Sequence, residues 1–282
     1  MRLSATTRRL LVPMAALALA GGVAAAGPAS AKPRVAAKAA WAPAATAAVH
    51  PGVMTYTAGA QCTANFVYTD GTSTYLGQAA HCSGTGAATD TNGCTATSLP
   101  EGTAVEVTGA TKPGVMVYNS WIRMQAAGEK DPNVCAYNDL ALIKLDPADV
   151  ALTNPSVPFF GGPTGLRTAD TQLGDTVVSY GNSSLRVGLS PLSPKYGRSL
   201  GTDSAGWNHT IYTATPGIPG DSGSGFLDAS GKAFGVLSTV AIAPLAGSNG
   251  VGSLAKEIAY AQAHGISGLA LVNGTEPFSG AL

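Results

Sequence analysis

The stretch "GIPGDSGSGF", from Gly217 to Phe226, raises the question that decides how the rest of the chain is interpreted. It places Ser222 between an acid and a glycine, with more glycines on both sides and an apolar residue at its end. Such a segment forms either a tight surface turn between two strands or a loop whose backbone comes very close to a bound molecule. The second possibility makes Ser222 a candidate nucleophile, which needs a base within hydrogen-bond reach.

The composition favours an all-β protein. Glycine accounts for 36 of the 282 residues, and only 11% of the residues are charged. Short β-branched runs alternate with Gly, Asn, Asp and Pro, which is typical of many strands joined by turns. One such run, "GVMVYNSWIRM" over 114–124, is predicted to be a strand. One helix is expected over 254–264, with Ser253 as its N-cap and Gly265 at its end.

Residues 1–31 have the pattern of a cleaved signal peptide. Arginines in the first nine positions precede an apolar run over 10–26, and "ASA" at 29–31 has the small-x-small form of a cleavage site. The apolar run is short for a membrane span, although an uncleaved anchor stays open as an alternative. We therefore expect a secreted protein, with the Ala- and Pro-rich residues 32–52 as a propeptide or linker.

The charge balance excludes some classes of partner. Loss of the leader leaves 13 basic and 16 acidic residues, and no run of like charges occurs. A mildly acidic chain of this kind gives no reason to expect nucleic acid or a membrane as a partner after the leader is removed. No cofactor motif or calcium loop is recognisable, so we expect no cofactor and no metal. We also expect a monomer.

Four cysteines are present, at Cys62, Cys82, Cys94 and Cys135. An even number in an exported chain is typical of two disulfides, and four cysteines allow three pairings. A zinc site is the competing interpretation, which the absence of C-x2-C and H-E-x-x-H spacings disfavours.

Three local patterns carry the chemistry. They are "QAAHC" with His81, "YNDLALIKL" with Asp139 and "GDSGSG" with Ser222. Asp139 begins an alternating apolar strand that would draw its carboxylate into a site of low dielectric, where an imidazole N–H is a suitable partner. In the order His, Asp, Ser, these patterns resemble the chymotrypsin-like serine proteases, and in particular their secreted bacterial branch. The resemblance covers roughly residues 53–264.

The resemblance implies a trypsin-like fold of two antiparallel six-stranded β-barrels with a C-terminal helix. The first barrel would span residues 53–145, and an inter-barrel crossing would occupy 146–172. Residues 173–282 would then form the second barrel and the C-terminal helix. The substrate cleft would lie between the barrels.

The resemblance also assigns roles to the three residues. Ser222 would attack the scissile carbonyl, His81 would take the serine proton and hand it to the leaving amine, and Asp139 would orient the imidazole and stabilise its charged form. The N–H groups of Gly220 and Ser222 would form the oxyanion hole, which stabilises the negative charge on the carbonyl oxygen. The chain is therefore expected to be a serine endopeptidase acting on proteins or peptides.

Further assignments follow from the same resemblance. Asp221 would be a structural latch, paired either with a new N-terminus made by proteolysis or with a basic side chain, although a simple turn aspartate is also possible. A Cys62–Cys82 bridge would tie down the histidine loop, and a Cys94–Cys135 bridge would brace the Asp139 segment.

The specificity pocket is expected to be neutral. By the family's register Pro216 would lie at its floor, and Ser238, Thr239 and Val240 would form one wall. A pocket for Arg or Lys needs an aspartate at that floor, and the glutamate-specific relatives use a histidine just before position 238. Neither is present, so a small or medium apolar residue is expected before the cut bond.

Two other functions compete with this interpretation. A catalytically silent protein of the same fold, acting as a secreted binding module, remains an alternative. An esterase of the α/β-hydrolase type is disfavoured, because "GDSGS" lacks the last glycine of G-x-S-x-G and the order of the three residues is reversed. The other histidines, His50, His209 and His264, are expected to be exposed polar residues.

Overall fold

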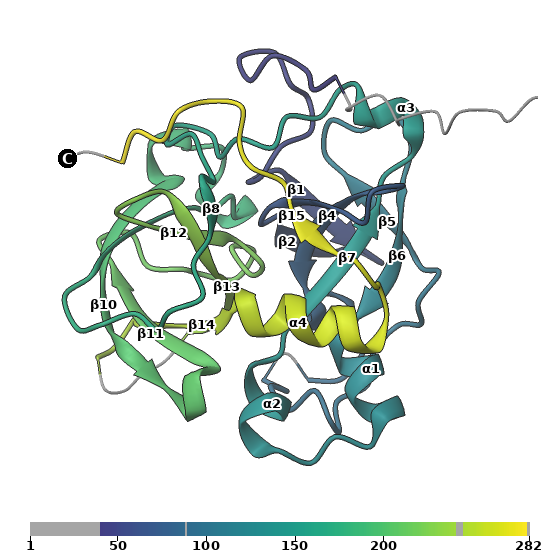
Figure 1. The fold of residues 1–282 in the computed structure, drawn as a ribbon, viewed down its shortest axis with the longest axis vertical. Helices are drawn as coiled ribbons and strands as arrows, with labels where there is room; N and C mark the ends of the chain where they lie inside the picture. Colours follow the sequence, from purple (N-terminus) through teal and green to yellow (C-terminus); the bar gives the residue numbers. More distant parts are fainter. Residues whose placement is uncertain (1–39, 88, 241–244, 281–282) are drawn as a thin grey trace, which may run out of the picture. The chain divides into compact units, whose positions relative to one another are not determined.

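The computed structural model describes residues 40–87, 89–240 and 245–280, which belong to one unit (Figure 1). The predicted signal peptide and residues 32–39 of the predicted propeptide or linker lie outside this range. Within the described part of the chain, no helix is long and apolar enough to cross a membrane.

The first sheet is antiparallel and comes mainly from the N-terminal half. Across the sheet, its strands are β15 (Ala270–Leu271), β3 (Val67–Thr69), β4 (Thr74–Ala79), β7 (Leu140–Lys144), β6 (Gly114–Asn119), β5 (Ala104–Val107), β1 (Met54–Thr57) and β2 (Ala60–Thr63). It has eight strands rather than six, because β1 and β2 form a hairpin at one edge and the returning C-terminal segment adds β15 at the other. Val67, Leu76 and Ile143 are among the apolar residues that fill its core.

The second sheet closes into a barrel. Its strands are β12 (Gly225–Asp228), β9 (Thr176–Tyr180), β10 (Pro194–Asp203), β11 (Asn208–Thr213), β14 (Asn249–Ser253), β13 (Lys232–Val240) and β8 (Gly165–Leu166). Pairing of β12 with both β9 and β13 closes six antiparallel strands, and β8 adds to β13 in parallel. The mostly-β architecture with a closed six-stranded antiparallel barrel confirms the expected fold class.

A hydrophobic cluster joins the two halves. It combines Phe66 and Leu140 of the first half with Val178 and Leu227 of the second, all buried. Leu254 of the C-terminal helix belongs to the same cluster. The relative placement of the two sheets therefore depends on shared apolar burial, which is the main favourable contribution to folding.

The C-terminal helix α4 (Leu254–His264) forms where the sequence predicts it. Ser253 occupies the N-cap position, although its side chain makes no capping hydrogen bond, and Gly265 is the C-cap. The helix packs against β13 and β14 and also against α1 (Ser120–Ala127), so it connects the two halves (Figure 1).

The predicted strand over 114–124 is wrong in its second half. β6 ends at Asn119, and Asn119 Oδ1 accepts hydrogen bonds from the N–H groups of Trp121 and Ile122, which begins α1. This N-cap satisfies backbone donors that the strand prediction overlooked. Two shorter helices, α2 (Pro132–Tyr137) and α3 (Pro147–Val150), begin with the same Asp-Pro pair, in which the aspartate is the cap.

Residues 42–49 pack onto the segment between the sheets. The Ala42 N–H donates to the Thr153 carbonyl at 2.9 Å, and the Val49 N–H donates to the Leu152 carbonyl at 3.1 Å. Val49 is completely buried. This part of the predicted propeptide or linker is thus built into the folded unit.

His209 is buried in β11, against the expectation that it would be exposed. Its Nδ1 lies 2.8 Å from Thr202 Oγ1 and 3.1 Å from Thr171 Oγ1, and its ring meets Phe234 edge to face. Because β11 lies inside the sheet between β10 and β14, the strand carries the imidazole out of solvent. Burial lowers the pKa of His209 to about 4, although the nearby Asp170 charge opposes this.

We expect His209 to make the protein less stable in acid. A histidine whose pKa falls on folding contributes its full stability above its unfolded value near 6.5, and that contribution is lost as the pH falls toward 4. Between pH 7 and pH 4.5 the wild type should lose about 2 kcal/mol of unfolding free energy more than His209→Gln does. Denaturant unfolding of both proteins at the two pH values measures this difference, and parallel losses would contradict the assignment.

Candidate active site

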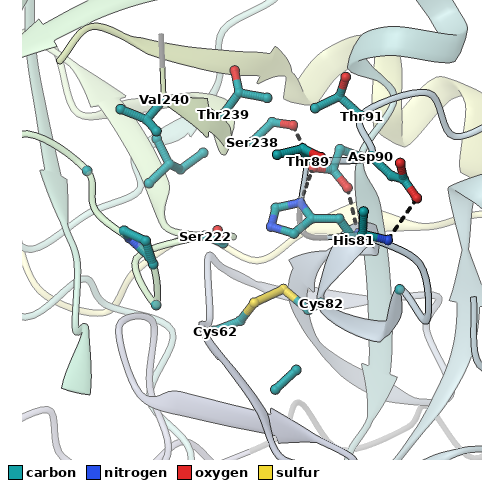
Figure 2. Close-up of a pocket in the computed structure, with 18 of the residues that line it drawn as sticks. Cys62, His81, Cys82, Thr89, Asp90, Thr91, Ser222, Ser238, Thr239 and Val240 are labelled. Carbon is teal, nitrogen blue, oxygen red and sulfur yellow. Dashed lines mark hydrogen bonds and ion pairs between the residues drawn. A yellow bond between two sulfur atoms is a disulfide. The ribbon is translucent and has the colours of Figure 1, made fainter. Parts of the chain in front are cut away.

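A cleft of about 570 Å³ is lined by residues from both halves (Figure 2). His81 and Asp139 come from the first half, and Ser222 and Ser238 come from the second. The structure therefore brings the three sequence-predicted catalytic residues to the same cavity, although Ser222 lies more than 80 positions from Asp139 along the chain.

The His81 side chain is held by its own short helix and by a disulfide. It lies in the 3-10 helix η1 (Ala80–Ser83), directly after β4. The neighbouring Cys82 is bonded to Cys62 of β2. Two hydrogen bonds then join His81 to Asp139: the backbone N–H donates to Oδ1 at 2.9 Å, and the ring Nδ1 lies 2.6 Å from Oδ2. This pairing leaves the ring Nε2 available to act on another group.

The Asp139 carboxylate is buried and has a third donor. Asp139 is 2% exposed, and Ser238 Oγ donates to its Oδ2 at 2.6 Å. A buried carboxylate is costly unless it is paired and hydrogen-bonded, and here His81 and Ser238 supply those partners from opposite halves. Ser238 was expected only as a pocket wall, and no local motif signals its contact with Asp139.

The charge on Asp139 changes the basicity of the imidazole. Burial by itself would lower the pKa of His81, but the negative charge and the hydrogen bond of Asp139 together raise it above its ordinary value. The side chain remains about a quarter exposed, on the side of the cleft. His81 is thus a base stronger than a free histidine and is open to a bound molecule.

Ser222 is half-buried at the cleft (Figure 2). Among the described residues, no hydrogen bond joins its hydroxyl to the His81 ring. Catalytic hydrogen bonds of this kind are often long in ligand-free sites and tighten when substrate binds. The Ser222 backbone is fixed from the first half, because its carbonyl accepts the Thr63 N–H at 2.8 Å.

Only glycine fits at position 220. Its φ is +94°, and a Cβ there would collide with Gln61 Oε1 and would come within 2.8 Å of Ser183 Oγ. Within the described part of the chain, neither the Gly220 N–H nor the Ser222 N–H donates to another protein group. Two uncommitted backbone donors beside a serine hydroxyl form an arrangement that can stabilise a negatively charged oxygen.

Asp221 is completely buried and pairs with two basic side chains. Arg186 Nη1 lies 2.5 Å from its Oδ1, and Lys195 Nζ lies 3.0 Å from its Oδ2. Both cations are themselves buried, and burial lowers the pKa of Lys195 while the Asp221 charge opposes that shift. The structure therefore shows a basic side-chain partner for this aspartate, and it shows two of them. Sequence reasoning missed both, because neither lies in a recognisable motif.

Pro216 does not line the cleft, although the sequence placed it at the pocket floor. Its carbonyl accepts hydrogen bonds from Arg186 Nη2 and Lys195 Nζ, which hold it toward the buried ion pairs. Ser238, Thr239 and Val240 do line the cleft, as expected for a wall.

Asn249, which sequence reasoning also missed, extends across this part of the cleft. It is 1% exposed, its Oδ1 accepts the Gly217 N–H at 2.9 Å, and its Nδ2 donates to the Thr239 carbonyl at 3.2 Å. Its side chain therefore joins Gly217 to the wall residue Thr239.

Both predicted disulfides are present, Cys62–Cys82 and Cys94–Cys135. Side-chain atoms of Cys62, His81 and Cys82 lie within 4.8 Å of one another. They do not form a metal-ligand set, because metals bind cysteine as thiolate and these two sulfurs are bonded to each other.

No protein-family model and no curated protein matches the sequence. Solved structures do match. Protease A of Thermobifida fusca is 16% identical at a TM-score of 0.51, over 80% of this chain and 99% of that one. A glutamic acid specific serine protease, described as using a histidine triad in substrate binding, is also 16% identical, at a TM-score of 0.52, over 79% of this chain and all of its own.

The chain has the chymotrypsin fold. The resemblance inferred from the three motifs is thereby confirmed at the level of fold, and the α/β-hydrolase alternative is excluded. At this level of identity, the likeness concerns the fold alone. Any conclusion about chemistry depends on the geometry of the cleft.

Glu257 of α4 lies behind Asp139 in this fold and is completely buried. Its Oε1 accepts the Asp139 N–H at 3.0 Å, while its buried Oε2 has no hydrogen-bond partner among the described residues. Burial raises the pKa of Glu257 well above its ordinary value, and the neighbouring Asp139 charge adds to the rise. Burial and the Asp139 charge thus both favour the neutral form of this carboxyl group, which would avoid a second negative charge beside Asp139.

We expect Glu257→Gln to remove a pH-dependent instability. A carboxyl whose pKa rises on folding stabilises fully below its unfolded value of about 4.5, and the contribution declines as the pH rises. The stability of the wild type relative to Glu257→Gln should thus fall by up to about 1.4 kcal/mol per pH unit above that value. Denaturant unfolding of both proteins from pH 4 to pH 8 measures it, and a difference independent of pH would show that Glu257 is ionised in the fold.

Proposed function

We propose that the chain is a secreted serine endopeptidase that cleaves peptide bonds through an acyl-enzyme. The observation that carries this proposal is the double hydrogen bond between His81 and the buried Asp139, in the cleft that Ser222 also lines. An oriented imidazole with a raised pKa beside a serine is what nucleophilic catalysis by a hydroxyl requires. The fold adds support, since the two structural neighbours described above are proteases.

The reaction runs in two stages. Ser222 Oγ attacks the scissile carbonyl while His81 Nε2 takes its proton, and the carbonyl oxygen becomes negatively charged between the N–H groups of Gly220 and Ser222. The C–N bond then breaks, and the amine leaves with the proton held by His81, which gives the acyl-enzyme. In the second stage a water molecule loses a proton to His81 and attacks the ester; the C–O bond to Ser222 then breaks, and His81 returns the proton to Ser222 Oγ, which releases the acid and regenerates the enzyme.

Asp139 keeps its negative charge throughout. It fixes the imidazole tautomer with the proton on Nδ1 and stabilises the imidazolium that forms in each stage. Ser238 supports this role, because its hydrogen bond restrains the Asp139 carboxylate. Neither a metal nor a cofactor has a part in this scheme.

We propose a preference for a small or medium uncharged residue before the cut bond. The part of the cleft beyond Ser222 is lined by Gly217, Ile218, Leu237, Thr239, Val240 and Asn249, which are all neutral. A buried cation in the substrate would find no acidic partner among these residues. Asn249 limits the depth, since its side chain occupies the space between Gly217 and Thr239.

Export is part of the proposal. The leader pattern in the sequence and two disulfides in the fold both fit an oxidising environment outside the cell. The molecule would act there as a monomer on protein or peptide substrates.

Replacement of Ser222 by alanine should abolish turnover without unfolding the protein. Without the nucleophile the acyl-enzyme cannot form, so kcat should fall by at least about 10⁴-fold. Assays with a casein substrate and labelling with a fluorophosphonate probe test this, with circular dichroism to confirm the fold. Hydrolysis by the wild type with loss of labelling in Ser222→Ala supports the proposal. A wild type that neither hydrolyses nor labels would favour the silent binding module.

Shortening Asn249 should deepen the specificity pocket. In Asn249→Ala, kcat/KM for peptides with Phe before the cut bond should rise about 10-fold relative to those with Ala, because one or more side-chain carbons gain room. Asn208→Ala is a matched control, since Asn208 also bonds to a neighbouring strand but does not line the cleft. A peptide-library profile compares the three proteins, and an unchanged profile in a folded Asn249→Ala would contradict the assignment.

A further inference from the structure

The peptide bond between Pro219 and Gly220 is held by a buried serine outside the proposed catalytic residues. Ser183 Oγ donates to the Pro219 carbonyl at 2.5 Å. The same hydroxyl accepts the Leu185 N–H at 3.2 Å, which caps the 3-10 helix η2 (Ser184–Arg186). Ser183 is only 2% exposed, so water competes little for the contact.

The next carbonyl along the chain is held from the opposite half. The Gly220 carbonyl accepts hydrogen bonds from Gln61 Nε2 at 2.9 Å and from Thr63 Oγ1 at 2.8 Å, and both donors belong to β2. Gln61 also accepts the Ser184 N–H through Oε1 at 3.0 Å. One side chain therefore links β2 both to η2 and to residues 217–224, which carry Gly220 and Ser222 and are called the nucleophile loop below.

These contacts fix the direction of the Gly220 N–H. In a trans peptide the carbonyl and the following N–H point in opposite directions. Because the Pro219 carbonyl is directed at Ser183, the Gly220 N–H points the other way, and Pro219, Gly220 and Ser222 all line the cleft. A rotated peptide would place a carbonyl oxygen where the scheme above needs a donor, and repulsion would replace stabilisation of the oxyanion.

Glycine makes such a rotation accessible. Gly220 has a φ of +94° and, without a Cβ, it can adopt many other φ values at little cost. The correct orientation therefore has to be imposed by neighbours. The η2 segment is suited to this, because it also carries Arg186, which pairs with Asp221 on the other side of Gly220.

We propose that Ser183 is a positioning residue for the oxyanion hole: its hydrogen bond to Pro219 keeps the Gly220 N–H directed into the cleft, and Gln61 supports this by holding the next carbonyl. This inference rests on the proposed protease function. Ser183 does not touch the reacting atoms and acts through the backbone of Gly220.

The proposal predicts that removal of the Ser183 hydroxyl weakens stabilisation of the transition state and leaves substrate binding unchanged. In Ser183→Ala the two peptide orientations would become closer in free energy, so only a fraction of molecules would present both donors to the oxyanion. Loss of this hydrogen bond should lower kcat about 10-fold with KM nearly unchanged. Affinity for a peptide aldehyde, which forms a tetrahedral adduct with Ser222, should fall by a similar factor.

The experiment compares Ser183→Ala with Ser183→Thr and Ser184→Ala. Threonine keeps the hydroxyl and should restore kcat, while Ser184 is an exposed neighbour whose side chain holds no carbonyl among the described residues. Each variant is assayed for kcat and KM on one peptide anilide, for aldehyde inhibition and for thermal midpoint. A folded Ser183→Ala with the kcat and aldehyde affinity of Ser184→Ala would overturn the proposal.

Two further outcomes are decisive. If Ser183→Ala does not fold, Gln61→Met replaces it, because it removes one of the two donors to the Gly220 carbonyl and also the acceptor of the Ser184 N–H. This variant should show a fall in kcat and aldehyde affinity at constant KM, and a wild-type kcat in it would overturn the proposal. The wild type separates this inference from the proposed function. A wild type that hydrolyses the anilide and labels at Ser222 upholds the function whatever Ser183 does, whereas an inactive wild type refutes both.

Discussion

The site depends on one buried carboxylate. Asp139 is almost completely removed from water, and its charge would be prohibitive there without partners. The partners come from both halves of the molecule: His81 from the segment after β4, and Ser238 from β13. The carboxylate has all of its hydrogen-bond partners only when both halves are in place. The same hydrogen bonds that orient the imidazole therefore also stabilise the packing of the two sheets against each other.

The loop that carries Gly220 and Ser222 also depends on contacts between the two halves. The nucleophile loop belongs to the second half, yet the carbonyls of Gly220 and Ser222 accept hydrogen bonds from Thr63 of the first. The glycine at 220 has no side chain to fix its own conformation, so the loop is defined by what surrounds it. The proposed catalytic geometry is therefore a property of the interface between the halves and does not reside in either one.

Local sequence predicted the parts of this site that local chemistry defines. His81, Asp139 and Ser222 each lie in a short motif, and the helix over 254–264 has an amphipathic pattern and a glycine at its end. The strand over 114–124 failed because nothing local shows that the Asn119 side chain accepts two backbone N–H groups and so begins the first turn of α1. His209 failed for a related reason, since the run that it begins does not reveal that β11 lies between β10 and β14, where the imidazole is buried.

The rest of the site could not be predicted, because it consists of contacts between distant positions. Ser238 meets Asp139 across 99 residues, and Glu257 meets the same aspartate across 118. Arg186 and Asp221 are 35 residues apart. The partner residues Ser238, Glu257 and Arg186 lie in no recognisable motif that would indicate these contacts. These contacts follow from how the strands are placed in space, and local sequence patterns do not reveal that placement.

The three buried carboxyl groups around the cleft avoid the cost of an isolated charge in three different ways. Asp139 lies beside an imidazole that can become cationic, Asp221 is paired with Arg186 and Lys195, and burial of Glu257 favours its neutral form. Their environments follow from what each position must do. In the proposed mechanism Asp139 stabilises the imidazolium that forms when His81 takes a proton, and a permanent cation beside the carboxylate would weaken that stabilisation. Asp221 has to stay fixed, which two cations achieve. Glu257 accepts the Asp139 N–H, and its neutral form does so without adding a charge beside Asp139.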